Sequence, residues 1–280
     1  MIPRRDFLKA SIATAALAGT AALAQDDTGR NPPTKETTMA DPFETAKLYK
    51  YLRVADVSDA MDGIGYFDLG LMDSEIRPLW LGMKFWGVAY TLRAVPANRP
   101  MWKLSTTEEI VNAHGLWFRE VTSKSYEADL KPGHVIVMDA GGARETGFWG
   151  SANSMGVMNR GVVGIVTNGH CRDTAEVVLE KVPICARRRG RTIIPGRIEL
   201  VQTQGRIGCG GVQVQPGDIV GCDDDGVIVV PAAVAEQVAI HARAVLLADM
   251  RARKGLYDRL GLPPDETVDI EKVEAYYNQF

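Results

Sequence analysis

The sequence has little excess of charge of either sign, because 32 lysines and arginines stand beside 35 aspartates and glutamates, for a formal net charge of −3. Nucleic-acid-binding proteins usually concentrate an excess of Lys and Arg, so no nucleic-acid partner is expected. Beyond the extreme N-terminus no apolar run approaches ~20 residues, so no integral membrane segment is expected in the mature chain. With 46% hydrophobic residues, the 280-residue chain still has ample material for a folded core.

Several catalytic patterns are also missing. No lysine lies between Lys131 and Lys181, so the central part of the chain offers no amine for a Schiff base. The four histidines have no paired metal-ligand spacing and the four cysteines form no C-x-x-C, which argues against a zinc site. No G-x-S-x-G elbow, Walker loop or complete G-x-G-x-x-G after a strand is present. Because His170 and Cys171 would point to opposite faces of a strand, they are not a nucleophile pair.

The N-terminus has the pattern of an export signal. Arg4 and Arg5 precede a Phe-Leu-Lys step, and a mildly apolar run then ends in Ala-Leu-Ala at residues 22–24. This pattern predicts a twin-arginine signal peptide over residues 1–24, and therefore a periplasmic or secreted protein. Residues 25–41 are polar and contain prolines, as in a disordered linker, which leaves residues 42–280 as one folded domain.

Hydrophobic periodicity in this body indicates a layered α/β fold, with helices on either side of a β-rich middle. Expected helices cover residues 43–52, 57–61, 151–159, 173–181 and 232–253; expected strands cover 89–94, 135–139, 162–167, 183–186, 198–202, 211–214, 219–222 and 227–230. All four cysteines lie in or beside apolar strand-like runs, where buried free thiols are common. No disulfide is predicted.

One candidate binding element is the glycine-rich segment from Asp139 to residue 154. A strand ends at Asp139, and a helix begins near Ser151. Free N–H groups at the start of that helix would suit a carboxylate or a phosphate. Glycine-rich turns of this kind are common in α/β proteins, so a purely structural loop is the alternative.

A second candidate follows the next expected strand. Arg172 and Asp173 stand at its exit, and Asp173 and Glu176 share one face of the helix that follows. Two carboxylates beside a guanidinium could hold a hard cation through oxygen ligands and water. The same spacing also forms a capping box, with Asp173 as N-cap and Glu176 reaching back. Spacing alone favours the cap, although a capping carboxylate can still expose one oxygen to a metal.

Three adjacent aspartates, residues 223–225, also suggest a cation site. Asp225 and Gly226, however, lie between two Val/Ile runs, which is a strong signal for a β-hairpin turn. A turn is therefore the preferred interpretation of this segment.

Taken together as an ordered set, these segments resemble the RraA-like family, which includes the 4-hydroxy-4-methyl-2-oxoglutarate/4-carboxy-4-hydroxy-2-oxoadipate aldolases. The resemblance covers roughly residues 52–253. It is carried by residues 57–61 (VSDAM), 132–139 (PGHVIVMD), 149–150 (WG), 161–169 (GVVGIVTNG), 172–176 (RDTAE) and 216–231.

The resemblance implies a β/β/α fold similar to phosphohistidine swivelling domains, assembled as homotrimers or homohexamers with sites between subunits. It further implies a divalent-metal lyase, a class II pyruvate aldolase, that cleaves 4-hydroxy-2-oxo acids and also decarboxylates oxaloacetate. Mg²⁺ or Mn²⁺ would be held by Asp173 and Glu176. Arg172 and Asp173 would be catalytic, and Gly150, Ser151, Ala152, Asn153 and Arg172 would bind the small 2-oxo acid.

The sequence departs from the family pattern in two places. Ser151 and Asn153 replace the more usual acidic or apolar residues after the glycine, and Asp249 is the nearest acid to a glutamate that reaches a neighbouring subunit's site in aldolase members. Members that lack the acid pair act as regulators that bind a ribonuclease. A non-catalytic regulator or a periplasmic small-acid-binding protein is therefore the alternative to the enzyme.

Overall fold

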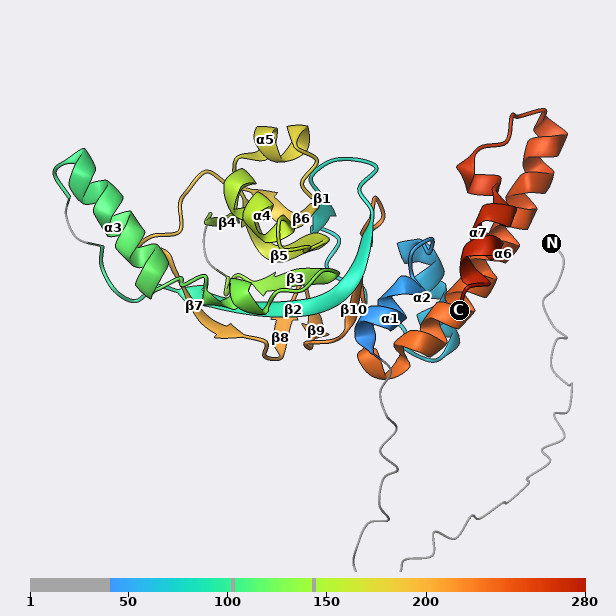
Figure 1. Cartoon of the computed structure of the whole chain (residues 1–280), viewed down its shortest axis with the longest axis horizontal. Coiled ribbons are helices and arrows are strands. Elements are labelled where there is room, and N and C mark those ends of the chain that lie inside the picture. Colours follow the sequence, from blue (N-terminus) through green and yellow to red (C-terminus); the bar gives the residue numbers. More distant parts are fainter. Residues whose placement is uncertain (1–40, 102–103, 143–144) are drawn as a thin grey trace, which may run out of the picture. The chain divides into compact units, whose positions relative to one another are not determined.

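The computed structural model describes residues 41–280 except 102–103 and 143–144. The expected signal peptide, and the expected linker up to residue 40, lie outside the described residues. The helices are α1 (Pro42–Lys47), α2 (Val54–Gly63), α3 (Thr107–Glu120), α4 (Ser151–Met158), α5 (Thr174–Leu179), α6 (Ala235–Leu260) and α7 (Ile270–Tyr277), with short 3-10 turns at Ser125–Asp129, Ala232–Val234 and Glu266–Val268. Figure 1 shows their arrangement.

The strands form a mixed sheet with the order β1-β6-β5-β3-β2-β10-β11, while β4 pairs with β5 and β7 with β2. Their bounds are β1 (Arg77–Pro78), β2 (Phe85–Pro96), β3 (His134–Asp139), β4 (Gly147–Trp149), β5 (Gly164–Cys171), β6 (Ile184–Arg189), β7 (Ile198–Thr203), β10 (Ile219–Asp223) and β11 (Gly226–Val230), with β8 (Ile207–Cys209) and β9 (Val212–Val214) as a separate hairpin. Strands β2, β3, β5 and β6 run parallel to one another, as helical crossovers require, whereas β1 pairs with β6, and β7 and β10 pair with β2, in the antiparallel sense.

The sheet curls until it is nearly closed. Residues 71–78 connect its two ends, because Leu71 bridges to Ile228 of β11 while β1 pairs with β6. The Arg77 side chain adds a hydrogen bond to the carbonyl oxygen of Asp225, at 2.6 Å. The mixed α/β domain with a layered, curled sheet confirms the fold class expected from the sequence.

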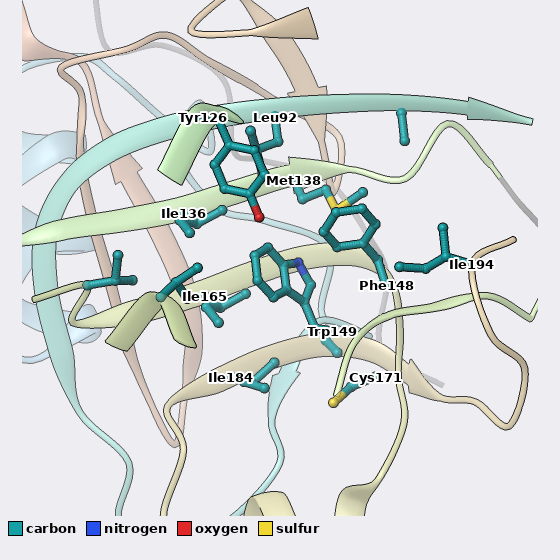
Figure 2. Close-up of a cluster of buried hydrophobic side chains, with 14 of the residues drawn as sticks. Leu92, Tyr126, Ile136, Met138, Phe148, Trp149, Ile165, Cys171, Ile184 and Ile194 are labelled. Carbon is teal, nitrogen blue, oxygen red and sulfur yellow. The ribbon is translucent and has the colours of Figure 1, made fainter. Parts of the chain in front are cut away.

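Period-two alternation explains how the strands divide the core. In β3, Val135 and Val137 face the interior of the curled sheet, whereas Ile136 and Met138 face the layer formed by α3, α4 and α5. Strand residues on the β2–β10–β11 side pack instead against α1, α2, α6 and α7. Figure 2 shows Trp149, which is fully buried, in the middle of the cluster and beside Phe148. This cluster supports one wall of the site described below.

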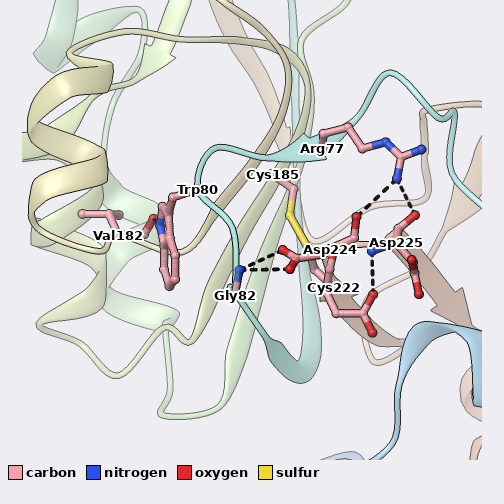
Figure 3. The surroundings of a disulfide bond; sticks show 9 residues. Arg77, Trp80, Gly82, Val182, Cys185, Cys222, Asp224 and Asp225 are labelled. Atoms are coloured by element: carbon pink, nitrogen blue, oxygen red, sulfur yellow. Dashed lines mark hydrogen bonds between the residues drawn. A yellow bond between two sulfur atoms is a disulfide. The ribbon is translucent and has the colours of Figure 1, made fainter.

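A disulfide joins Cys185 of β6 to Cys222 of β10 (Figure 3). The sequence predicted no disulfide and left the state of the four cysteines open; the structure has this one bond, and Cys171 and Cys209 are free and buried. The two strands are separated by three others in the sheet order, and only the curl of the sheet brings their inner faces together. Sequence spacing gives no signal of this closure.

The expected hairpin is confirmed between β10 and β11. Asp223 pairs with Gly226, so the two turn residues are Asp224 and Asp225, one position earlier than the Asp-Gly signal suggested. The Asp224 carboxylate accepts a hydrogen bond from the Gly82 N–H, as Figure 3 shows. This contact gives the Asp224 carboxylate a structural role that needs no metal. None of the helices in the described ranges combines the length and the apolarity that crossing a membrane requires.

Candidate active site

A cavity of about 380 Å³ lies at the edge of the sheet where β4 and β5 end. Five of the residues predicted to form the site line it: Gly150, Ala152, Asn153, Arg172 and Asp173. The remaining lining residues are Phe118, Thr122, Lys124, Gly147, Phe148, Ile193 and Ile194. The cavity therefore brings together the glycine-rich segment, residues 139–154, and the Arg172–Asp173 pair.

Strand pairing brings these two segments together. β4 runs parallel to β5, with Trp149 opposite Cys171, so both strands deliver their following residues to one edge. The N–H of Arg172 donates to the carbonyl oxygen of Trp149 at 2.9 Å. Arg172 and Asp173 are consequently placed next to Gly150 and the start of α4.

The two segments approach so closely that a Cβ atom at either of two glycines would force a neighbouring side chain to move. A Cβ at position 150 would lie 2.4 Å from Oδ2 of Asp173, and a Cβ at position 147 would lie 2.8 Å from Cβ of Arg172. Gly150 has φ −141°, which any residue adopts, so its glycine is required by the contact and not by the backbone. The absence of a side chain here leaves room for the carboxylate.

Asp173 does not cap α5 as the capping-box interpretation required. It occupies the N-cap position with φ 51°, in the left-handed region, and its side chain makes no capping hydrogen bond. A capping aspartate normally has extended backbone, which aims its carboxylate at the N–H groups of the first turn. Here the carboxylate points instead to Gly150, and its Oδ2 lies 3.5 Å from Nε of Arg172. Its side chain is 40% exposed.

The amino end of α4 is available to an anion. Gly150 is its N-cap and offers no side-chain hydrogen bond, so the first N–H groups of the helix have no side-chain acceptor. Asn153 Nδ2 donates to the Phe148 carbonyl oxygen at 3.1 Å, and its buried Oδ1 has no hydrogen-bond partner among the residues that the structure describes. Ser151 Oγ donates to Glu180 at 2.6 Å, so its side chain turns to the end of α5 and does not line the cavity.

Two predicted acids lie elsewhere. Glu176 is exposed on α5 and is not among the cavity-lining residues. Asp249 is on α6, where its carboxylate pairs with Arg53 at 2.8 Å. Neither acid lines the cavity that Asp173 lines, so the second metal ligand and the acid from a neighbouring subunit stay predictions.

The donor set suits a hard cation that keeps most of its water. Within residues 41–280, apart from the gaps at 102–103 and 143–144, no cluster of three or more His, Cys, Asp or Glu side chains is placed to hold a metal. Mg²⁺ is commonly bound through only one or two carboxylates plus waters and substrate oxygens. The Asp173 carboxylate makes no capping hydrogen bond, is partly exposed and lines the cavity, so it fits that mode of binding.

Sequence reasoning missed the wall that faces these residues. Phe118 lies in the last turn of α3, a helix that was not predicted although Thr106 and Glu109 form a capping box at its start. Ile193 and Ile194 lie in the loop after β6. The Thr106–Glu109 spacing was a usable signal for α3. Nothing local marks the loop at 193–194 as part of a site.

A family model described as RraA-like: Aldolase/RraA matches residues 54–229. The chain belongs to the RraA-like family. The matched residues run from α2 to β11 and include every residue of the cavity.

Individual relatives agree with this membership. Protein DlpA of Legionella pneumophila is 26% identical over 229 residues, which cover 81% of this chain but only 34% of DlpA, so the match spans about a third of that protein. A Halalkalibacterium halodurans protein named "Putative 4-hydroxy-4-methyl-2-oxoglutarate aldolase" is 28% identical over 73% of this chain and 84% of its own length.

The solved structure of Streptomyces coelicolor RraAS2, described as an unusual member of the RNase ES inhibitor RraA protein family, has a TM-score of 0.62 at 23% identity and covers 75% of this chain and 97% of that one. At that identity the likeness to RraAS2 shows the fold alone.

Proposed function

We propose that the chain is a divalent-metal-dependent lyase that cleaves 4-hydroxy-2-oxo acids, such as 4-hydroxy-4-methyl-2-oxoglutarate, to release pyruvate. One observation carries the proposal: Arg172 and the uncapped carboxylate of Asp173 line the same cavity as the amino end of α4. A guanidinium, a carboxylate free to hold a cation, and unpaired N–H groups together suit the keto oxygen and the carboxylate of a 2-oxo acid. Membership of the RraA-like family and the name of the H. halodurans relative support the same activity.

The first turn of α4 would bind the carboxylate of the pyruvyl group. The N–H groups of Ser151, Ala152 and Asn153 have no side-chain cap and carry the positive end of the helix dipole. Because the α4 N-terminus lies directly across Gly150 from Asp173, a bound carboxylate places the adjacent keto oxygen toward Arg172 and Asp173. Main-chain donors hold the substrate without any side-chain rearrangement.

Arg172 would stabilise the charge that develops during cleavage. Retro-aldol cleavage breaks the C3–C4 bond, and the electron pair remains on the three-carbon fragment as the enolate of pyruvate. The guanidinium is always ionised and lies beside the position of the former keto oxygen. Removing one preorganised donor of this type typically lowers kcat by about 10²–10³.

Asp173 would hold the cation, and Glu176 remains the predicted second carboxylate. A bound Mg²⁺ or Mn²⁺ supplies Lewis-acid polarisation of the keto group. Oδ2 of Asp173 lies 3.5 Å from Nε of Arg172, and both residues line the cavity. Decarboxylation of oxaloacetate passes through the same enolate and is therefore proposed as a companion activity.

The test is pyruvate release from 4-hydroxy-4-methyl-2-oxoglutarate and from oxaloacetate, followed with lactate dehydrogenase and NADH. We expect turnover with Mg²⁺ or Mn²⁺ and none above background with EDTA. Asp173→Asn should lower turnover by roughly 100-fold or more, since Lewis-acid polarisation contributes several kcal/mol. Asp258→Asn, which removes the same charge from an exposed position on α6, is the matched control and should have no effect. Absence of turnover with any 2-oxo acid in the presence of metal would contradict the proposal.

A second candidate function is binding without catalysis, as a regulator or as a periplasmic small-acid-binding protein. The position of Glu176 outside the cavity lining favours it, because the acid pair is what separates the enzymes from the regulators in the family resemblance. Binding of pyruvate that is unchanged by Asp173→Ala, together with no turnover, would identify this function.

We further propose that the protein is exported by the twin-arginine route and acts as a homotrimer or homohexamer. The paired Arg4 and Arg5 and the Ala-Leu-Ala sequence at 22–24 support export. N-terminal sequencing of protein from the periplasmic fraction should begin at Gln25, and light scattering of the purified protein should give three or six copies. An unprocessed N-terminus in the cytoplasm, or a monomer, would contradict these proposals.

A further inference from the structure

The cavity has one apolar wall that the proposed chemistry does not use. Phe118, Phe148, Ile193 and Ile194 line it together with the charged pair Arg172 and Asp173. Phe148 and Ile194 are nearly fully buried members of the hydrophobic cluster in Figure 2, where they lie next to each other, and Phe118 packs against that cluster. This wall is therefore a continuation of the core to the surface of the cavity.

The apolar wall is held in place by long-range contacts. The Glu145 carboxylate accepts two hydrogen bonds from the Arg191 guanidinium, at 2.6 and 2.7 Å. Thr146 and Thr192 form a β-bridge, and the Gly147 N–H donates to the Thr192 carbonyl oxygen at 3.1 Å. The main-chain contacts of Thr192 hold the loop that carries the two isoleucines against β4, and the solvent-exposed Glu145–Arg191 ion pair adds little to them. A fixed apolar surface binds a substituent without a large ordering cost.

Apart from Arg172, the described residues of the lining include one cationic side chain, Lys124. Its ammonium group already has an acidic neighbour, Oε1 of Glu127 at 3.8 Å, and its side chain is 43% exposed. An ion pair that is open to solvent stabilises little, so Lys124 is a weak anchor for a second substrate carboxylate. The balance of contacts at this wall favours an apolar group.

We propose that the enzyme prefers 4-hydroxy-2-oxo acids whose C4 carries an apolar group, aryl or branched alkyl, over those whose C4 carries a carboxylate. This inference rests on the proposed lyase function and names its substrate class. With a phenyl group at C4, the hydroxyl loses its proton to solvent, the C3–C4 bond breaks, and C4 becomes the carbonyl carbon of an aldehyde. The electron pair left on C3 takes a proton from solvent, so the products are pyruvate and benzaldehyde, with no oxidant or reductant.

The test compares two substrates that differ only at C4: 4-hydroxy-2-oxo-4-phenylbutanoate and 4-hydroxy-2-oxoglutarate. One methylene in an apolar pocket changes specificity about 10- to 200-fold, so kcat/KM should favour the phenyl substrate by at least about 10-fold. Phe118→Ala should reduce that preference by about 10-fold, measured as the ratio of the two kcat/KM values. Leu116→Ala, on the same helix but outside the lining, is the matched control.

Binding of uncleavable acids separates this inference from the lyase proposal. Calorimetry with Mg²⁺ should show 2-oxo-4-phenylbutanoate binding at least about 10-fold more tightly than 2-oxoglutarate, whether or not any substrate is cleaved. Oxaloacetate turnover with equal or tighter binding of 2-oxoglutarate would overturn the apolar preference and leave the lyase intact. A phenyl preference in binding without turnover of any substrate would support the apolar wall and contradict the lyase.

Discussion

A Cβ atom at position 150 would lie 2.4 Å from Oδ2 of Asp173, so that the carboxylate would have to move. The start of α4 and the exit of β5 therefore meet with no space for a side chain between them. This contact places the carboxylate of Asp173 in the same cavity as the free N–H groups of α4. The position of the Asp173 carboxylate beside the start of α4 depends on this close approach.

Replacing Gly150 by alanine should disable the site while the domain stays folded. The new methyl group would displace the Asp173 carboxylate, and a misplacement of about 1 Å at a reacting centre can cost about 100-fold in rate. The measurement is kcat/KM for pyruvate release beside the thermal unfolding midpoint. Gly156→Ala is the matched control: it lies in the same helix with no heavy atom near the new Cβ, and should stabilise by about 0.5–1 kcal/mol at unchanged activity. Full activity in Gly150→Ala would show that the contact is irrelevant to function.

Replacing Arg172 by lysine should lower kcat much more than it alters KM. A lysine keeps the charge but loses the planar fork of donors that can share the developing enolate oxygen and the Asp173 carboxylate. The expected loss is about 10²–10³ in kcat for oxaloacetate decarboxylation, measured at saturating Mg²⁺. Arg251→Lys, at an exposed ion pair with Glu274 on the α6 surface, serves as the control. A changed KM at constant kcat would instead assign Arg172 to ground-state binding alone.

Thiol chemistry should report two free cysteines and one disulfide. Burial raises the pKa of the Cys171 and Cys209 thiols to about 12, so neither is a thiolate at neutral pH. Iodoacetamide should leave the native protein unlabelled, add two groups after unfolding without reductant, and add four after reduction, as read by intact mass. Four additions without reductant would contradict the Cys185–Cys222 bond.

Stability should decline as the pH falls below about 6.5, in part because of His134. Burial, and to a smaller extent the nearby Lys131 charge, lower the pKa of this histidine, and its Nδ1 accepts the Lys131 N–H. Below the unfolded pKa of about 6.5 the unfolded chain takes up a proton that the folded chain resists, so the free energy of unfolding decreases until the pH reaches the lowered folded pKa. Above about pH 6.5 His134 is neutral in the unfolded chain as well, so it adds nothing to the pH dependence of the free energy of unfolding.

Urea unfolding at pH 5 and pH 7.5 measures that effect. His134→Gln should reduce the difference in unfolding free energy between the two pH values, by at most about 1.4 kcal/mol per pH unit for one proton. His241→Gln, on the exposed face of α6, should leave the difference as it is in the parent protein. An unaltered pH dependence in His134→Gln would remove this histidine from the acid response.

Much of the strand framework and part of the site could be predicted from the sequence, because they depend on local pattern. The Val/Ile runs identified β3, β5, β10 and β11, and the break from strand to glycine-rich loop to helix identified the start of α4. Arg172 and Asp173 were found because they stand at the exit of an expected strand, three residues before Glu176, in a segment that carries the family resemblance.

The rest depends on contacts between distant residues. The Asp173-x-x-Glu176 pattern is locally a capping box, and only the left-handed backbone of Asp173, beside Gly150, turns its carboxylate away from the helix. Likewise, Ile193 enters the cavity because the preceding residue, Thr192, pairs through its main chain with Thr146 and Gly147. The disulfide depends on the curl of the whole sheet. No periodicity or spacing in the sequence encodes these approaches.

The most direct test of the site is calorimetric titration of oxalate, an analogue of the pyruvate enolate, into the full-length protein. Oxalate should bind only when Mg²⁺ or Mn²⁺ is present. Asp173→Asn should abolish that metal-dependent binding, and Asp258→Asn should retain it. Oxalate affinity that is the same with and without metal, or unchanged in Asp173→Asn, would contradict the proposed metal site.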